Sequence, residues 1–137
     1  SVVAGDYTYM YGNTGPGSLH EWILELARAE GIDLRGKQAS DLDEDDGTPC
    51  DCADYAPFQE IGIPFVYFEA NNWDAGDKDG WTQVDPSKIP GGKPADGVIW
   101  HTKYDDLQWL DQHFPGRVNA HLKVFVTLLV KTLLLFS

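Results

Sequence analysis

Basic residues are scarce in this sequence. Its 137 residues hold 10 Lys and Arg against 22 Asp and Glu, which gives a net charge of −12. Proteins that bind nucleic acid need clustered cations for the phosphates, so this imbalance excludes nucleic acid as the expected partner. It also argues against adhesion to anionic membranes. A chain of this length can bury a core, and we expect residues 1–137 to form a single domain.

Cysteine is equally rare, with only Cys50 and Cys52, one residue apart. A disulfide between them would close a tight, strained ring, so the pair does not indicate a secreted disulfide framework. Free thiols, a local disulfide and a metal or redox role all stay open. Residues 1–5 lack the basic head and apolar core of a signal peptide. Because the sequence starts abruptly inside an expected strand, we expect it to be cut from a longer protein.

Several motifs of catalysis and metal binding are absent. His20-Glu21 begins like the zinc-binding H-E-x-x-H motif, but position 24 is Leu. The acidic run 41–47 lacks the Gly and Glu that an EF-hand loop needs at its sixth and twelfth positions, so we expect a solvated loop. The sequence also has no Gly-rich phosphate loop and no nucleophile elbow.

Hydrophobic spacing and capping residues predict strands and helices in alternation. The expected elements are a strand over 2–12, a helix from Ser18 to Gly31, a short helix over 55–61, a strand over 63–70, a long loop over 71–97, a strand over 97–100, and helices over 105–113 and 117–136. This order is typical of an α/β fold with helices on both faces of a parallel or mixed sheet. The last helix is expected to be buried and not to span a membrane, since Lys131 interrupts its densest apolar stretch.

One of the four histidines, His101, stands where a metal ligand is expected. It follows a predicted strand, lies between Trp100 and Thr102, and has Asp105 four residues further on. A His at a strand end with a carboxylate nearby is typical of a metal ligand and the group that orients it. The alternative is that His101 is an ordinary loop residue and that Asp105 only caps the next helix.

Three motifs together resemble a known family. They are Asp54-Tyr55-Ala56-Pro57-Phe58, Gly62-Ile63-Pro64 and Trp100-His101-Thr102-Lys103-Tyr104-Asp105. The chain resembles the C-terminal half of the di-zinc aminopeptidases of peptidase family M-28, and most closely the branch called alkaline phosphatase isozyme conversion aminopeptidase. The resemblance implies part of a three-layer αβα sandwich of the zinc-dependent exopeptidase type. It also implies two zinc ions in the full-length protein and a peptide substrate that loses its N-terminal residues.

The same resemblance assigns roles to individual residues. The final His ligand of the family lies in the third motif, so the resemblance implies that His101 is a zinc ligand. It makes Asp54, Tyr55, Trp100 and Asp105 candidates for the second shell or the substrate pocket. Two positions depart from the family, since Tyr55 stands where many members have His and Trp100 where many have Tyr.

The remaining family ligands and the general-base Glu belong to upstream motifs that this sequence lacks. A catalytic zinc takes about three protein ligands, so His101 alone cannot hold one. We therefore expect a C-terminal fragment of a zinc aminopeptidase that is inactive alone and supplies no catalytic residue. The alternative is a non-catalytic binding or interaction module on a degenerate peptidase scaffold. Family relatives are often exported, but nothing in this sequence indicates a location.

A partial domain is expected to leave apolar surface and a sheet edge uncovered. The predicted strand at residues 2–11 and the last helix are the candidate surfaces. We therefore expect self-association, by pairing through an exposed sheet edge or by swapping.

Overall fold

The computed structural model describes residues 3–38, 54–78 and 80–135. The acidic run 41–47 and both cysteines lie outside the described residues, so the predictions made for them stay predictions. The described elements, in chain order, are β1 (Tyr7–Gly12), α1 (Leu19–Ala29), β2 (Arg35–Gln38), α2 (Ala56–Glu60), β3 (Val66–Asn71), the 3₁₀ helix η2 (Pro86–Lys88), α3 (Leu107–His113) and α4 (Arg117–Leu135).

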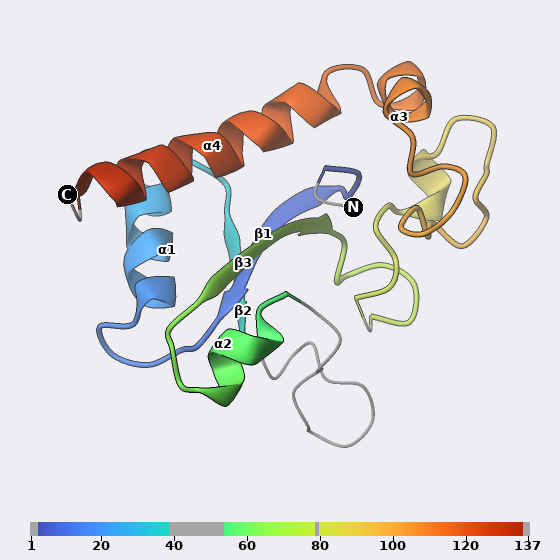
Figure 1. Cartoon of the computed structure of the whole chain (residues 1–137). Coiled ribbons are helices and arrows are strands. Elements are labelled where there is room, and N and C mark those ends of the chain that lie inside the picture. Colours follow the sequence, from blue (N-terminus) through green and yellow to red (C-terminus); the bar gives the residue numbers. More distant parts are fainter. Residues whose placement is uncertain (1–2, 39–53, 79, 136–137) are drawn as a thin grey trace. The chain divides into compact units, whose positions relative to one another are not determined.

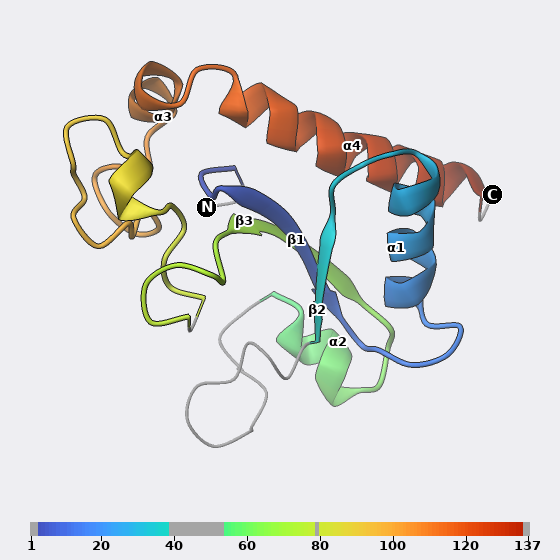
Figure 2. The ribbon, with the colours of Figure 1, turned by 180° about the vertical axis from the view of Figure 1, so that it is seen from behind.

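The strands form one three-stranded sheet in the order β2-β1-β3 (Figures 1 and 2). β1 and β2 are parallel, from Tyr9 opposite Arg35 to Gly12 opposite Gln38, and α1 is the crossover between them. Gly12 lies against Phe65, whereas Gly5 lies against Ala70, so the chain from Gly5 to Gly12 runs antiparallel to the chain from Phe65 to Ala70. The predicted α/β class and mixed sheet are confirmed, while the three-layer sandwich stays a prediction.

Two sequence-based expectations about the strands are wrong, and one strand was not predicted. Among the described residues β1 is the central strand, so residues 7–12 are not a free edge, and β2 and β3 are the outer strands. The predicted strand over 97–100 is absent, because side chains take the backbone N–H groups that a ladder would need. β2 was not expected, since its sequence Arg-Gly-Lys-Gln shows no apolar alternation and only pairing with β1 makes it a strand.

The structure divides into two compact units, one of which comprises residues 9–68. Its helix α1 begins as predicted, because the Ser18 hydroxyl accepts from the Glu21 N–H at 3.1 Å and the Glu21 carboxylate accepts from the Gly17 N–H at 2.8 Å. The predicted end is confirmed too, as Gly31 has a φ of 66° just after the last turn.

The other unit comprises residues 1–8 and 69–137. Its core joins the N-terminal segment and the long segment after β3 to α3. The buried members of this core are Ala4, Val84, Ile89, Ile99, Leu110 and Phe114. The described part of segment 71–97, expected to be a loop, thus supplies core residues while holding little regular structure.

Helix α4 differs from the expected buried helix. Only Phe125 and Leu128 are buried along its 19 residues. The helix is long and apolar enough to cross a membrane, although a core helix of a soluble protein passes the same test. The predicted absence of a membrane span is therefore not confirmed.

Candidate functional site

The predicted metal ligand His101 lies on a loop that one buried glutamine organises. Gln83 is 1% exposed, and its Oε1 accepts from the backbone N–H of Ile99 at 2.8 Å and of Trp100 at 3.0 Å. Its own backbone N–H donates to the Gly97 carbonyl at 3.1 Å. Because buried N–H groups need acceptors, this side chain replaces the missing strand partner and determines the course of the loop up to His101.

His101 itself has a rare backbone conformation, with a φ of 58°. A non-glycine residue in the left-handed region costs about 1–3 kcal/mol, and such residues concentrate at functional sites. The imidazole stacks on the neighbouring indole of Trp100, with ring centroids 3.9 Å apart and planes inclined by 24°. The Trp81 ring packs in turn on the Trp100 indole, with ring centroids 5.1 Å apart. His101 is also exposed. The residue is therefore accessible from solvent although its ring stacks on Trp100.

The residues after His101 form a tight turn that leads into α3. The Thr102 hydroxyl donates to the Ile99 carbonyl at 2.6 Å and accepts from the Tyr104 N–H at 3.1 Å. Asp106, and not Asp105, caps α3, since the Asp106 carboxylate accepts from the Trp109 N–H at 2.9 Å. The capping alternative for Asp105 is therefore wrong. Asp105 is exposed, and its N–H donates to the Thr102 carbonyl at 3.1 Å.

The other predicted site residues divide between the two units. Trp100, His101 and Asp105 belong to the unit that contains α3 and α4. Within the part of the chain that the structure describes, no hydrogen bond joins Asp105 to His101, so a second-shell role for Asp105 stays a prediction. Asp54 and Tyr55 belong to residues 9–68.

In that unit Asp54 is exposed and Tyr55 is buried. The Tyr55 ring stacks on Phe65 at 4.8 Å with an interplanar angle of 5°, and it packs on Tyr67 at 5.9 Å. These contacts make Tyr55 a member of a small aromatic core, which is sufficient to explain its burial.

The described residues do not make a complete zinc site. Across residues 3–38, 54–78 and 80–135, no group of three His, Cys, Asp or Glu side chains is arranged to hold a metal ion. A catalytic zinc takes about three protein ligands plus water, and His101 can supply one. The fit is therefore incomplete, and the geometry supports no catalytic step through a metal in the described residues.

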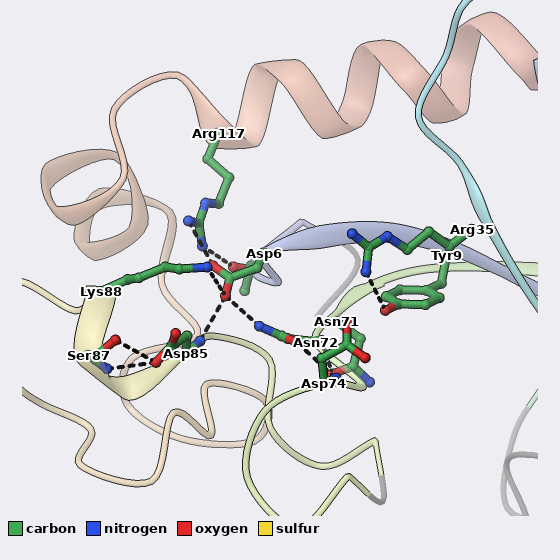
Figure 3. Close-up of polar contacts among 11 residues, drawn as sticks. Asp6, Tyr9, Arg35, Asn71, Asn72, Asp74, Asp85, Ser87, Lys88 and Arg117 are labelled. Atoms are coloured by element: carbon green, nitrogen blue, oxygen red, sulfur yellow. Dashed lines mark hydrogen bonds and ion pairs between the residues drawn. The ribbon is translucent and has the colours of Figure 1, made fainter.

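The sequence analysis missed a buried polar cluster around Asp6 (Figure 3). The Asp6 side chain is 3% exposed, and its carboxylate pairs with the Arg117 guanidinium at 3.1 Å and the Lys88 ammonium at 3.5 Å. It also accepts from the Asn72 amide at 2.7 Å and the Asp85 N–H at 2.8 Å. The cluster joins the N-terminal segment, the segment after β3, η2 and α4.

The cluster also reaches the His101 loop through the backbone. The Asp6 N–H donates to the Gln83 carbonyl at 2.8 Å, and the Gln83 side chain holds Ile99 and Trp100. Acidic residues are so common in this chain that no sequence signal marked Asp6 among them. Its burial is a property of the tertiary structure.

One histidine beside this cluster makes stability depend on pH. His121 Nδ1 donates to the Val3 carbonyl at 2.9 Å, and partial burial, together with the charge of Arg117, lowers the pKa of His121 below its ordinary value of 6.5. The unfolded chain therefore binds this proton at a higher pH than the folded chain, so stability from neutral His121 is complete above about pH 6.5 and falls as pH decreases from there.

We expect the free energy of unfolding, measured by urea titration, to fall between pH 7 and pH 5.5 by less in His121→Gln than in the unmodified chain. The substitution removes the titrating group and leaves the acidic residues unchanged. Equal decreases in the two proteins would contradict the assignment.

The structure is thus a mixed α/β protein in which His101 is exposed and stacks on Trp100. Among curated proteins, the chain is similar to the alkaline phosphatase isozyme conversion protein of Escherichia coli (strain K12), at 35% identity over 101 residues. The match covers 73% of this chain and 28% of that protein, so the chain spans little more than a quarter of the relative's length. No family model matches the chain, and no solved structure matches it significantly. The predicted resemblance to this branch is supported, whereas membership of peptidase family M-28 stays a prediction.

Proposed function

We propose that this chain supplies the C-terminal wall of a zinc-dependent aminopeptidase site, with His101 as one zinc ligand. The observation that carries the proposal is the backbone of His101. A φ of 58° at a non-glycine residue is strained, and the Gln83 hydrogen bonds and the Trp100 stack hold it in place. Such support pre-orients an exposed imidazole, and pre-orientation favours metal binding.

The sequence similarity to the isozyme conversion protein supports the same proposal. That protein is named for the conversion of alkaline phosphatase isozymes, and removal of N-terminal residues from a peptide chain is a reaction that changes an isozyme. The substrate proposed for the complete site is therefore a polypeptide with a free N-terminus. The further zinc ligands and the general base would come from outside the described residues, and the three-layer αβα sandwich is part of this proposal.

The first test measures zinc and turnover on the chain itself. After dialysis against trace zinc we expect less than one tightly held ion per chain and no hydrolysis of aminoacyl p-nitroanilides, because one imidazole is too few ligands. Peptidase activity that disappears in His101→Ala would refute the inactivity of the isolated chain. Two tightly held ions would show that other residues, or a second chain, complete the site.

A chimera tests the ligand role directly. The matching segment of the Escherichia coli relative is replaced by this chain, and zinc content and alkaline phosphatase isozyme conversion are measured. We expect His101→Ala to lower the zinc content of the chimera and to abolish conversion, since losing one ligand disrupts a metal site. His113→Ala is the matched control, because His113 Nδ1 donates to the Trp109 carbonyl at 2.8 Å within α3 and the proposal gives His113 no ligand role. Equal zinc content in the two variants would favour the alternative, a non-catalytic interaction module.

A further inference from the structure

The least expected surface of this protein is one side of α4. Leu122, Val126, Leu129, Val130 and Leu133, which we call the α4 stripe, are 44–62% exposed. On another side of the same helix Phe125 and Leu128 are buried. Contiguous apolar side chains of this size are rarely left in water on a monomer, and they mark a site of interaction. The α4 stripe and the buried pair thus lie on different sides of one helix.

The spacing within the α4 stripe indicates the kind of partner. Leu122, Val126, Leu129 and Leu133 follow one another at intervals of four, three and four residues. This alternation of four and three residues fits the a and d positions of a coiled-coil seam, at which the apolar side chains of one helix pack against those of another. A second helix with the same spacing would therefore fit the α4 stripe along its length.

The residue types at these positions indicate which helix is the partner. Val126 and Leu133 occupy a positions and Leu122 and Leu129 occupy d positions, while Asn119, which is exposed, falls at the preceding a position. At Val126, the one β-branched a position, Leu at both neighbouring d positions favours two parallel strands, and a single Asn at a specifies the register. Two copies of α4 satisfy both preferences at once, since Asn119 then meets Asn119 across a two-fold axis.

The charges on α4 are compatible with such a pair. The helix carries Arg117, Lys123 and Lys131 and has no acidic residue. In a parallel pair Lys123, at an e position, faces the g positions of the partner, which are uncharged here (Val118, Phe125 and Thr132). No lysine is brought against a like charge across the seam, although the helix has no acid to neutralise one.

The first turn of α4 is held in a way that disfavours a lipid occupant. The Arg117 guanidinium donates to the Ala4 carbonyl at 3.0 Å and pairs with buried Asp6 at 3.1 Å. Entering a bilayer as a span would break this buried pair, which costs several kcal/mol, and would bury Lys123 and Lys131 in hydrocarbon. Pairing with a second helix requires neither.

We propose that this chain forms a parallel two-fold dimer through the α4 stripe. The dimer is independent of the proposed zinc ligand, since His101 lies on the loop before α3. The edge predicted at residues 2–11 does not provide the contact, because β1 is the central strand of the described sheet.

Sedimentation equilibrium tests the proposal over a concentration series that reaches about 100 μM, a range chosen for an interface of a few apolar anchors. We expect dimers that dissociate on dilution. Leu129→Lys, which puts a charge at the centre of the seam, should raise the dissociation constant at least about tenfold. Ala120→Lys is the matched control, because Ala120 is exposed on the same helix but at a b position. Val126→Lys is the second seam variant, and circular dichroism checks that each variant folds.

Disulfide trapping then tests the parallel register. In a Cys50→Ser/Cys52→Ser background, Val126→Cys should form a covalent dimer on mild oxidation, because equal a positions meet across a parallel seam. Ala120→Cys should not. A monomer at every concentration, a dimer unaffected by both seam variants (Leu129→Lys and Val126→Lys), or equal trapping at positions 120 and 126 would each overturn the proposal. Monomers that float with phosphatidylcholine vesicles would overturn it in favour of a lipid occupant.

Discussion

Gly5→Ala is expected to destabilise the protein by more than about 4 kcal/mol, or to prevent folding, because a Cβ at Gly5 would overlap the Ala70–Asn71 peptide group. The overlap is with backbone, which a change of rotamer cannot relieve. The N-terminal segment and the end of β3 would therefore have to separate. Urea unfolding followed by tryptophan fluorescence measures the loss.

Gly36→Ala provides the comparison within the same protein. A Cβ at Gly36 would meet the Leu24 methyl at 2.6 Å and the His20 ring at 3.0 Å, both of which belong to side chains on α1. Side-chain ends can shift, so we expect a smaller loss, of about 1–3 kcal/mol, typical of overpacking. A loss in Gly5→Ala no greater than in Gly36→Ala would contradict the close backbone approach.

Asp6→Ala is expected to have the second largest effect, a loss of about 3–5 kcal/mol in the free energy of unfolding. The substitution leaves the Arg117 guanidinium, 19% exposed, without its carboxylate. Burial already lowers the pKa of Arg117, while the charge of Asp6 opposes that change, so the unpaired cation would lie in an unfavourable environment. The Asn72 amide and the Asp85 N–H lose an acceptor as well.

The controls for Asp6→Ala separate its pairing from its charge. Asp111→Ala removes an exposed carboxylate from α3 and should change stability by no more than about 0.5 kcal/mol. In the double variant with Arg117→Met, the losses should be less than additive, because the charge left unpaired by the first change is removed by the second. Additive losses would show that the Asp6–Arg117 pair contributes little.

The two proposals of this structure concern different parts of one unit. The zinc-ligand proposal rests on the strained backbone and aromatic support of His101, and the dimer proposal rests on the α4 stripe. A His101 variant should leave sedimentation unchanged, and an α4 stripe variant should leave the zinc content of the chimera unchanged. The two hypotheses can therefore fail separately.

Local signals in the sequence were sufficient for α1 and for the α/β class. The Ser18 cap with Glu21 and the terminal Gly31 are interactions between residues close in the chain, so their pattern survives in any fold. The sequence also identified His101 as the histidine to follow, through its neighbours Trp100 and Asp105. Its resemblance to the isozyme conversion branch agrees with the similarity found over 73% of the chain.

Other features were decided only by the tertiary structure, because they depend on residues distant in sequence. β2 is a strand because β1 pairs with it, and residues 97–100 are not a strand because Gln83 takes their N–H groups. Asp6 is buried because Arg117, 111 residues later, reaches it. The apolar density of α4 predicted a buried helix, but density along the sequence does not reveal which sides have a partner. Local capping and apolar spacing thus determined α1 and the α/β class, and long-range pairing decided which polar groups are buried and which apolar ones are left in water.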